Sequence, residues 1–278
     1  MSDILHVSDT ALLVAACRAL ETTRPHGLVC DPFAAQLAGE RGVAMLHALP
    51  QPEIMCFGVG IRTRFLDELV TDTARKVATV LCLGSGLDTR PWRLDLPPDL
   101  RWIEADFPAM LDYKAGMMAP HQPKCRLERL PADVTDGAAR SALFAAAGNA
   151  PALMITEGLL MYLPAETVEA LAVEPAPVSG IRYWLMDVMS REAARRVGMS
   201  VIQSIQNLRA ESRLEGEEIL AVLNRTGWTP VERRTYTADA IAAAPERIKE
   251  FMASRPAPGQ MEPPMPDDPS GIYLFARG

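Results

Sequence analysis

The sequence predicts an α/β protein with a doubly wound, mainly parallel seven-stranded sheet whose last strand pair is antiparallel. Between residues 77 and 190, short apolar runs alternate with stretches of helical spacing, a pattern typical of a parallel sheet covered by helices on both faces. Two further strand-like runs close the chain, and no strand-like run precedes residue 77. We therefore expect a helical N-terminal region, a sheet core and an insert after the fifth strand.

The N-terminal region is predicted to be helical throughout. In "DTALLVAACRALET" the apolar residues recur at helical spacing, and Asp9 or Thr10 is the predicted N-cap. "DPFAAQLAGERG" and "GIRTRFLDELVTDTA" are further helical segments. We expect residues 1–76 to form an extension or cap that packs on a core of residues 77–278.

Five apolar runs predict the parallel strands: "ATVLCLG", "LRWIEAD", "CRLERL", "PALMITEG" and "IRYWLMDVM". Helix-compatible stretches separate them. A polar, helical segment at about residues 190–215 is the predicted insert, a candidate cap over a pocket. "GEEILAVLNRTGW" predicts one more helix, and "TPVERRTYT" and "GIYLFARG" predict the last two strands. Doubly wound dehydrogenase domains do not need such a final pair.

Composition excludes several classes of protein. Hydrophobic residues make up 49% and charged residues 23% of the chain, as in soluble globular proteins. The formal net charge of −7 and the lack of a basic cluster count against a nucleic-acid partner, and no apolar run is long enough to span a membrane. Five scattered cysteines without a CxxC motif and four dispersed histidines predict a cytoplasmic protein with reduced thiols and no metal site.

The first predicted strand ends in a glycine loop, within "VLCLGSGLDTRPWRL". Gly84, Ser85 and Gly86 follow the apolar run, and glycine there allows a tight turn and close approach of a ligand. Thr89 stands where a dinucleotide-binding fingerprint has its third glycine. A Gly-x-Gly sequence alone is equally typical of a plain strand-to-helix turn, so the other strand ends decide its meaning.

Acidic residues end the next three predicted strands: Asp106, Asp133 and Glu157. In an open parallel sheet these ends meet at one edge, where ligands bind. So many carboxylates would repel a pyrophosphate. S-adenosylmethionine has no phosphate, and it offers a ribose diol to Asp106, an adenine amino group to Asp133 and an ammonium group to Glu157. The sequence therefore favours S-adenosylmethionine over a dinucleotide as the cofactor.

Four segments, in order, carry a family resemblance: "LCLGSGLDTRPWRL", "WIEADFPAMLDYK", "PADVTD" and "TEGLLMYLPAETVEAL". They resemble the leucine carboxyl methyltransferase superfamily, which includes bacterial polyketide carboxyl methyltransferases of the tetracenomycin type. The N-terminal "VSDTALLVAACRALETTRPHGLVCDPFAAQLAG" is similar to the bacterial branch, and the resemblance weakens after about Leu171. It implies a Rossmann-like class I methyltransferase fold with S-adenosylmethionine as cofactor.

The resemblance also implies roles for single residues. Arg62 matches an arginine near the methionine carboxylate of the cofactor, and Tyr162 matches a tyrosine on the substrate side, which makes it the candidate catalytic residue. Asp88 and Arg93 match positions that shape the loop. The implied cofactor-binding set is Arg62, Gly84, Ser85, Gly86, Asp88, Asp106, Asp133, Val134 and Glu157. As alternatives, Arg62 pairs on its own helix with Asp67 or Glu68, and Tyr162 is an ordinary half-buried tyrosine.

The implied reaction is SN2 transfer of a methyl group to an oxygen of a small molecule. A carboxylate acceptor is ionised at neutral pH and needs no general base, whereas a phenol would profit from one. No histidine stands at a strand end, which favours a carboxylate over a hydroxyl substrate. Three alternatives stay open: a protein C-terminal carboxyl methyltransferase, a non-catalytic S-adenosylmethionine-binding module and an NAD-dependent oxidoreductase. The sequence leaves the oligomeric state undetermined.

Overall fold

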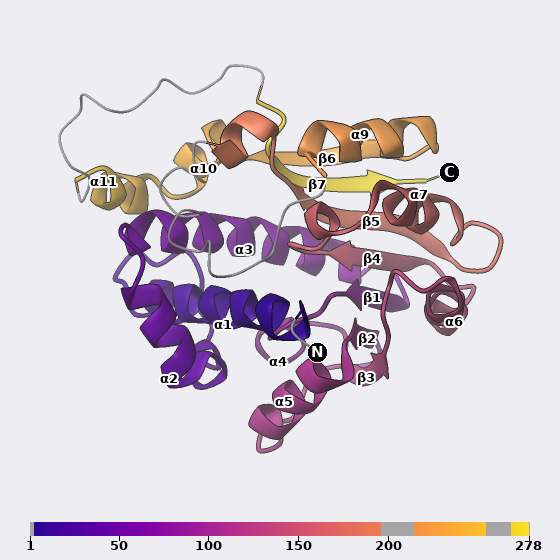
Figure 1. The fold of residues 1–278 in the computed structure, drawn as a ribbon, viewed down its shortest axis with the longest axis horizontal. Helices are drawn as coiled ribbons and strands as arrows, with labels where there is room; N and C mark the ends of the chain where they lie inside the picture. Colours follow the sequence, from indigo (N-terminus) through magenta and orange to yellow (C-terminus); the bar gives the residue numbers. More distant parts are fainter. Residues whose placement is uncertain (1–2, 196–213, 254–267, 278) are drawn as a thin grey trace. The chain divides into compact units, whose positions relative to one another are not determined.

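The computed structural model describes residues 3–195, 214–253 and 268–277, with residues 3–8 described by their backbone only (Figure 1). These residues form two compact units. The helical unit lies within Met1–Phe65, Met189–Arg209 and Arg234–Gly271, and the sheet unit lies within Leu66–Val188, Ala210–Arg233 and Ile272–Gly278. The boundary near residue 65 falls inside one helix, α3 (Pro52–Ala74).

A seven-stranded sheet forms the second unit, with strand order β3-β2-β1-β4-β5-β7-β6 (Figure 1). Strands β1 to β5 pair in parallel, and β6 and β7 form the antiparallel C-terminal pair. The predicted fold class is confirmed, and a strand forms in each of the runs predicted to hold one. The strands are β1 (Thr79–Leu83), β2 (Arg101–Asp106), β3 (Arg126–Pro131), β4 (Ala152–Thr156), β5 (Ile181–Val188), β6 (Thr229–Thr235) and β7 (Gly271–Ala276).

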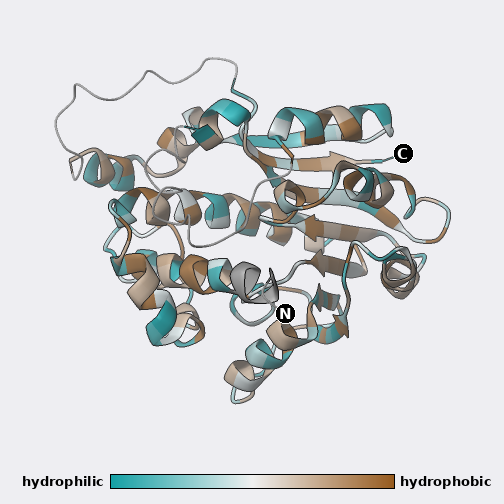
Figure 2. Cartoon of the chain, viewed as in Figure 1, coloured by the Kyte–Doolittle hydropathy of each residue, from teal (hydrophilic) through white to brown (hydrophobic). Residues whose placement is uncertain are grey.

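The core of the sheet unit lies around its central strands. Every residue of β1 and of β4 is buried, because both strands are apolar runs with neighbouring strands on both sides. Figure 2 shows this concentration of hydrophobic residues along the middle of the sheet. The helices of this unit are α4 (Arg90–Arg93), α5 (Pro108–Met118), α6 (Gly137–Ala147), α7 (Ala165–Val173) and α9 (Gly216–Arg225), with a short 3-10 helix, η1 (Leu160–Tyr162).

Local capping explains where several of these helices begin. Proline occupies the first turn of α5, where no intrahelical N–H bond is lost. Asp136 caps α6 by accepting a hydrogen bond from the Ala138 amide. At α9, Glu215 and Glu218 form a reciprocal capping box. The starts of α5 and α6 end the short connections that leave β2 and β3.

The helical unit contains α1 (Asp3–Thr22), α2 (Ala34–His47), the first part of α3, α10 (Ala238–Ala243) and α11 (Pro245–Ala253). Its C-terminal helix joins the N-terminal one, because Arg247 Nη2 donates to Oε1 of buried Glu21 at 2.6 Å. The predicted N-cap at Asp9 or Thr10 is wrong. Helix α1 begins at Asp3, and Asp9 lies inside it, where its carboxylate accepts from Arg41 at 2.5 Å. The helical pattern extends upstream of the apolar run used to place the cap.

Most of the predicted insert at about residues 190–215 lies outside the described residues, and its role as a cap stays a prediction. At its start, the Ser190 amide donates to Ser270 Oγ at 2.8 Å within the helical unit. All five cysteines are free thiols. No helix in the described part of the chain is both long and apolar enough to cross a membrane.

Candidate functional site

The connectivity of the sheet defines where a ligand would bind. From β1 the chain winds to β2 and β3 on one side, then crosses to β4 on the other side of β1. Ligands of such sheets bind beyond the carboxyl ends of the strands at this reversal point. The glycine loop 84–86 follows β1, Asp106 ends β2, Asp133 follows β3 and Glu157 follows β4. Topology thus brings these sequence-predicted positions to one edge of the sheet.

The glycine loop adopts a backbone that favours glycine. Gly84 has φ +61° and Gly86 has φ +41°, both in the left-handed region. A Cβ atom on Gly84 would lie 3.0 Å from Leu159 Cδ1. The Ser85 amide donates to the Ala105 carbonyl at 3.2 Å, which docks the loop onto β2. The loop therefore presents backbone rather than side chains to the strand ends.

Asp106 is hydrogen-bonded directly to this loop. Its Oδ2 accepts from the Gly86 amide and its Oδ1 accepts from the Phe107 amide, both at 2.7 Å. Burial raises the pKa of Asp106, and the two amides and the Lys114 ammonium only partly oppose this rise. Each carboxylate oxygen can accept a further hydrogen bond. Asp106 is therefore held in place while it retains capacity for hydroxyl donors.

A buried arginine connects three acidic residues near the loop. Arg90 donates through Nε to Asp67 at 2.7 Å, and through Nη1 to Asp88 at 3.1 Å and to Glu157 at 2.8 Å. Its side chain is 2% exposed. Burial lowers the pKa of Arg90, but Asp88, Glu157 and Asp67 more than reverse this, so the pKa lies well above its ordinary value. The guanidinium is therefore permanently charged and joins α3, the loop and the end of β4.

Sequence reasoning missed Arg90 and Asp67 as members of this cluster. The sequence offers Asp67 as an alternative partner for Arg62 on its own helix, and in the structure the Asp67 carboxylate binds Arg90 and both Nη atoms of Arg93. Asp88 also bonds the loop itself, since its Oδ1 accepts from the Arg90 amide at 2.9 Å. The Asp-x-Arg spacing of residues 88 and 90 was the available signal for this contact.

Asp187, at the end of β5, was missed as well. Its Oδ1 accepts from the Gly158 amide at 2.6 Å, and Gly158 has φ +60° directly after Glu157. Asp187 therefore secures the turn that carries Glu157. An acid near the end of the fifth apolar run, "LMDVM", was the signal that could have identified it.

The remaining sequence-predicted residues have varied surroundings. Asp133 is exposed and accepts from the amide and hydroxyl of Thr135 at 2.9 and 2.8 Å, an Asx turn that closes β3. Val134 is buried in the core of the sheet unit. Tyr162 is half-buried at the end of η1. Arg62 lies half-buried on α3, within the helical unit.

A second buried ion pair supports the loop. Lys114 Nζ lies 2.6 Å from Glu104 Oε1 and donates to the Ser85 carbonyl at 3.4 Å. Arg129 Nε donates to Glu104 Oε2 at 3.1 Å. The Ser85 hydroxyl is buried and has no hydrogen-bond partner among the residues described here. A buried hydroxyl of this kind has hydrogen-bonding capacity that water or a ligand can satisfy.

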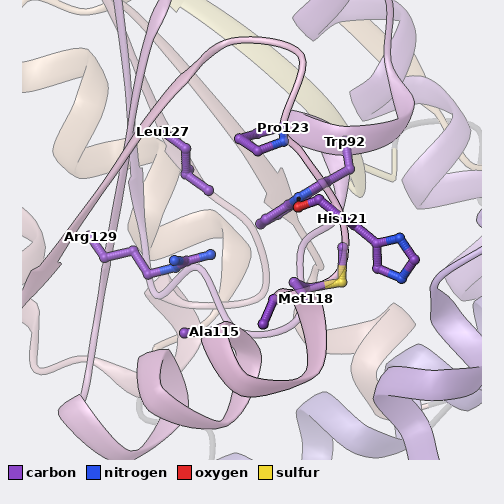
Figure 3. Close-up of a pocket in the computed structure, with 8 residues that line it drawn as sticks. Trp92, Ala115, Met118, His121, Pro123, Leu127 and Arg129 are labelled. Atoms are coloured by element: carbon purple, nitrogen blue, oxygen red, sulfur yellow. Dashed lines mark hydrogen bonds between the residues drawn. The ribbon is translucent and has the colours of Figure 1, made fainter.

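A cavity of about 230 Å³ lies elsewhere in the sheet unit (Figure 3). Figure 3 shows Arg129 directed towards Trp92, and Arg129 Cζ lies 5.8 Å from the Trp92 ring centroid. None of the sequence-predicted site residues lines the cavity, so we do not assign the candidate site to it. Its lining residues are Trp92, Ala115, Met118, Ala119, His121, Pro123, Leu127 and Arg129.

The fold and the strand-end cluster define a doubly wound α/β protein with a candidate ligand site at the carboxyl edge of its sheet. Within the described ranges, no group of three or more His, Cys, Asp or Glu side chains is arranged to hold a metal ion. The chain belongs to the leucine carboxyl methyltransferase family, whose model, described as "Leucine carboxyl methyltransferase", matches residues 11–174. This match includes the glycine loop and every sequence-predicted site residue.

Two relatives are similar to this chain in sequence, and one solved structure is similar to it in fold. A Streptomyces avermitilis protein named "Putative S-adenosyl-L-methionine-dependent methyltransferase" is 38% identical over 174 residues, which are 58% of this chain and 62% of that protein. The alignment therefore spans about three fifths of that relative's length. A Mycolicibacterium smegmatis protein of the same description is 32% identical over 266 residues, 88% of this chain and 80% of its own. The crystal structure of a DUF574 family protein from Streptomyces avermitilis has a similar fold, with TM-score 0.59, 18% identity and coverage of 95% and 97% of the two chains.

Proposed function

We propose that this chain is an S-adenosylmethionine-dependent O-methyltransferase whose acceptor is a carboxylate of a small molecule. The observation that carries the proposal is the 2.7 Å hydrogen bond between the Gly86 amide and Asp106, which joins an acid to the glycine loop at the reversal point of the sheet. Family membership supports the proposal, and so do the names of the relatives.

The residues present fit this cofactor. Asp106 has acceptor capacity for a ribose diol, and the orphaned Ser85 hydroxyl offers a further polar contact. The two buried cations beside the loop, Arg90 and Lys114, are both paired with carboxylates. Neither has its charge available for a phosphate. The donor set thus suits a cofactor that carries hydroxyl and ammonium groups and no phosphate.

The residues of the chain have mainly binding and orienting roles in this reaction. When bound, the cofactor supplies a methyl group on a sulfonium, so the S–C bond breaks as the O–C bond forms and its electron pair stays on the resulting thioether. A carboxylate acceptor is already ionised at neutral pH, so no residue has to remove a proton. Asp106 and Glu157 would hold the adenosyl and methionine parts, and Tyr162 would orient the acceptor and exclude water.

Three other functions have less support from the residues of this chain. Thr89, in place of a third glycine, is buried and its hydroxyl accepts from Arg93 Nε at 3.0 Å, which disfavours a dinucleotide and hence an NAD-dependent oxidoreductase. A protein C-terminal carboxylate would undergo the same chemistry and differs only in the acceptor. A non-catalytic module would bind the cofactor without turnover.

Calorimetry with S-adenosylmethionine and S-adenosylhomocysteine tests the cofactor. We expect a dissociation constant on the order of micromolar or tighter, in the range typical of enzyme substrates. NADH serves as the control ligand and should not bind. Absence of binding by both sulfur compounds would overturn the proposal.

The acceptor is tested with a methyl-labelled cofactor and a panel of small carboxylic acids, phenols and a peptide with a free C-terminal carboxylate. Label that base treatment releases as methanol identifies a carboxyl methyl ester, because phenol methyl ethers resist base. Base-stable label would exclude a carboxylate acceptor. Label on the peptide alone would favour a protein substrate, and cofactor binding without any label transfer would favour the non-catalytic module.

A further inference from the structure

We infer that Arg90 is a positioning residue for the methionine end of the cofactor site, acting through Glu157 without touching the ligand itself. The inference rests on the proposed function, because it takes Glu157 as a cofactor-binding carboxylate. Its structural basis is the 2.8 Å contact between Arg90 Nη1 and Glu157 Oε2 within a guanidinium that binds two further acids.

Arg90 joins three segments that are distant in the sequence. Asp67 lies on α3, Asp88 lies in the loop after β1, and Glu157 follows β4. The planar guanidinium donates to all three in fixed directions, and its burial excludes competing water. A lysine has a single ammonium group on a flexible stem and cannot reproduce this geometry.

Contacts from other elements fix the position of Glu157, because this residue lies beyond the hydrogen-bonded strand β4 and next to a glycine. It lies outside β4 and precedes Gly158, which has φ +60° and lacks a side chain to pack. Asp187 fixes the Gly158 amide at 2.6 Å, and Arg90 fixes the Glu157 carboxylate. Backbone and side chain are therefore held from two separate elements, β5 and α4.

Charge balance gives a second reason. The cluster holds three carboxylates, of Asp67, Asp88 and Glu157, against the guanidinium groups of Arg90 and Arg93. Loss of the contacts that Arg90 makes with these carboxylates would leave them to repel one another in a partly buried space. Glu157 is the member that the proposed function assigns to the methionine moiety, so its displacement would weaken binding of that moiety.

The test compares two ligands of an Arg90→Lys variant. S-adenosylhomocysteine carries the amino-acid moiety, whereas 5′-methylthioadenosine has the same adenosine and a thioether but no amino acid. By calorimetry we expect S-adenosylhomocysteine affinity to fall by about 10- to 100-fold, the range for a charged hydrogen bond, and 5′-methylthioadenosine affinity to change less than about threefold. An equal loss for both ligands would mean a general structural role, and no loss would mean no role. Both outcomes overturn the inference.

A double-mutant cycle with Glu157→Gln tests whether Arg90 acts through that carboxylate. In the Glu157→Gln background, Arg90→Lys should leave the preference for S-adenosylhomocysteine unchanged. A further fall in preference would mean that Arg90 contacts the ligand by another path. As a matched control, Arg101→Lys disturbs another arginine pair of the sheet unit, with Glu128 at 3.0 Å, where Arg101 starts β2, and should leave the preference intact.

If Arg90→Lys does not fold, Asp67→Asn provides the second measurement. It removes the negative charge of the carboxylate that binds Arg90 Nε. The Arg90 and Glu157 side chains themselves are not substituted. The preference for S-adenosylhomocysteine should fall in the same direction, and an unchanged preference would overturn the inference. Wild-type binding separates the two hypotheses: failure to bind S-adenosylhomocysteine defeats the proposed function, whereas normal wild-type binding with unchanged variants defeats only the inference.

Discussion

The Lys114 ammonium lies 2.6 Å from Glu104 Oε1, and both side chains are fully buried. The pair joins α5 to β2, and Lys114 also donates to the Ser85 carbonyl of the glycine loop. Burial raises the pKa of Glu104, and Lys114 and Arg129 only partly oppose this rise. Stability of the sheet unit and geometry of the loop therefore depend on the same contact.

Lys114→Met should strongly destabilise the protein, because it leaves Glu104 buried and removes the closer of the two cations that the described residues place on it. We expect the free energy of unfolding to fall by about 3–5 kcal/mol, measured by urea denaturation at neutral pH. Arg225→Met, which breaks an exposed pair with Glu169, is the control and should cost less than about 1 kcal/mol.

The same variant should show a defined pH dependence. An acid whose folded-state pKa is raised contributes stability that is present below its unfolded pKa and is lost as pH rises through the folded pKa. Loss of Lys114 raises the pKa of Glu104 further, so the deficit of Lys114→Met should shrink on acidification and grow as pH rises through the folded pKa. A deficit that is constant with pH would argue against Glu104 as its source.

Asp106 predicts a pH dependence of cofactor binding. Burial raises its pKa in the free protein. Ribose hydroxyls that donate to the ionised carboxylate would lower that pKa in the complex, so affinity should decrease as pH falls through the free-state pKa, by up to about tenfold per pH unit. Calorimetry with S-adenosylhomocysteine between about pH 4.5 and pH 7 measures the slope.

Asp106→Asn is the matched variant for this titration. It should bind S-adenosylhomocysteine about 10- to 100-fold more weakly at neutral pH, because a charged hydrogen bond is lost, and its affinity should be flat over the same range. Unchanged affinity in the variant would mean that another acid binds the ribose.

Gly84→Ala should impair both stability and cofactor binding. Its φ of +61° costs an L-residue about 1–2 kcal/mol, and the new Cβ would press on Leu159 at 3.0 Å. Thermal unfolding and calorimetry measure the two effects. Gly148→Ala is the control, because Gly148 has φ +75° with nothing within 4 Å of the added Cβ. It should lower stability by a similar amount and leave affinity unchanged.

The strands were predictable because their signals are local. Apolar runs such as "TVLCL" of β1 and "ALMIT" of β4 are stable in a soluble fold only when both faces are covered. The apolar run by itself therefore predicted a buried strand. The start of α1 was not predictable from the apolar run, because helical propensity continues upstream to Asp3. The candidate acids were predictable as a group, because parallel strands deliver their carboxyl ends to one edge.

The sequence by itself determined the order of strands and helices, the glycine loop and the acids at the strand ends, because each depends on neighbours within a few residues. Only the tertiary structure decided how these acids are held. Arg90 meets Asp67 and Glu157 across 23 and 67 residues of chain, and no periodicity encodes such contacts. They arise because the packing of α3, the loop after β1 and the end of β4 encloses a guanidinium and leaves it three carboxylates as partners.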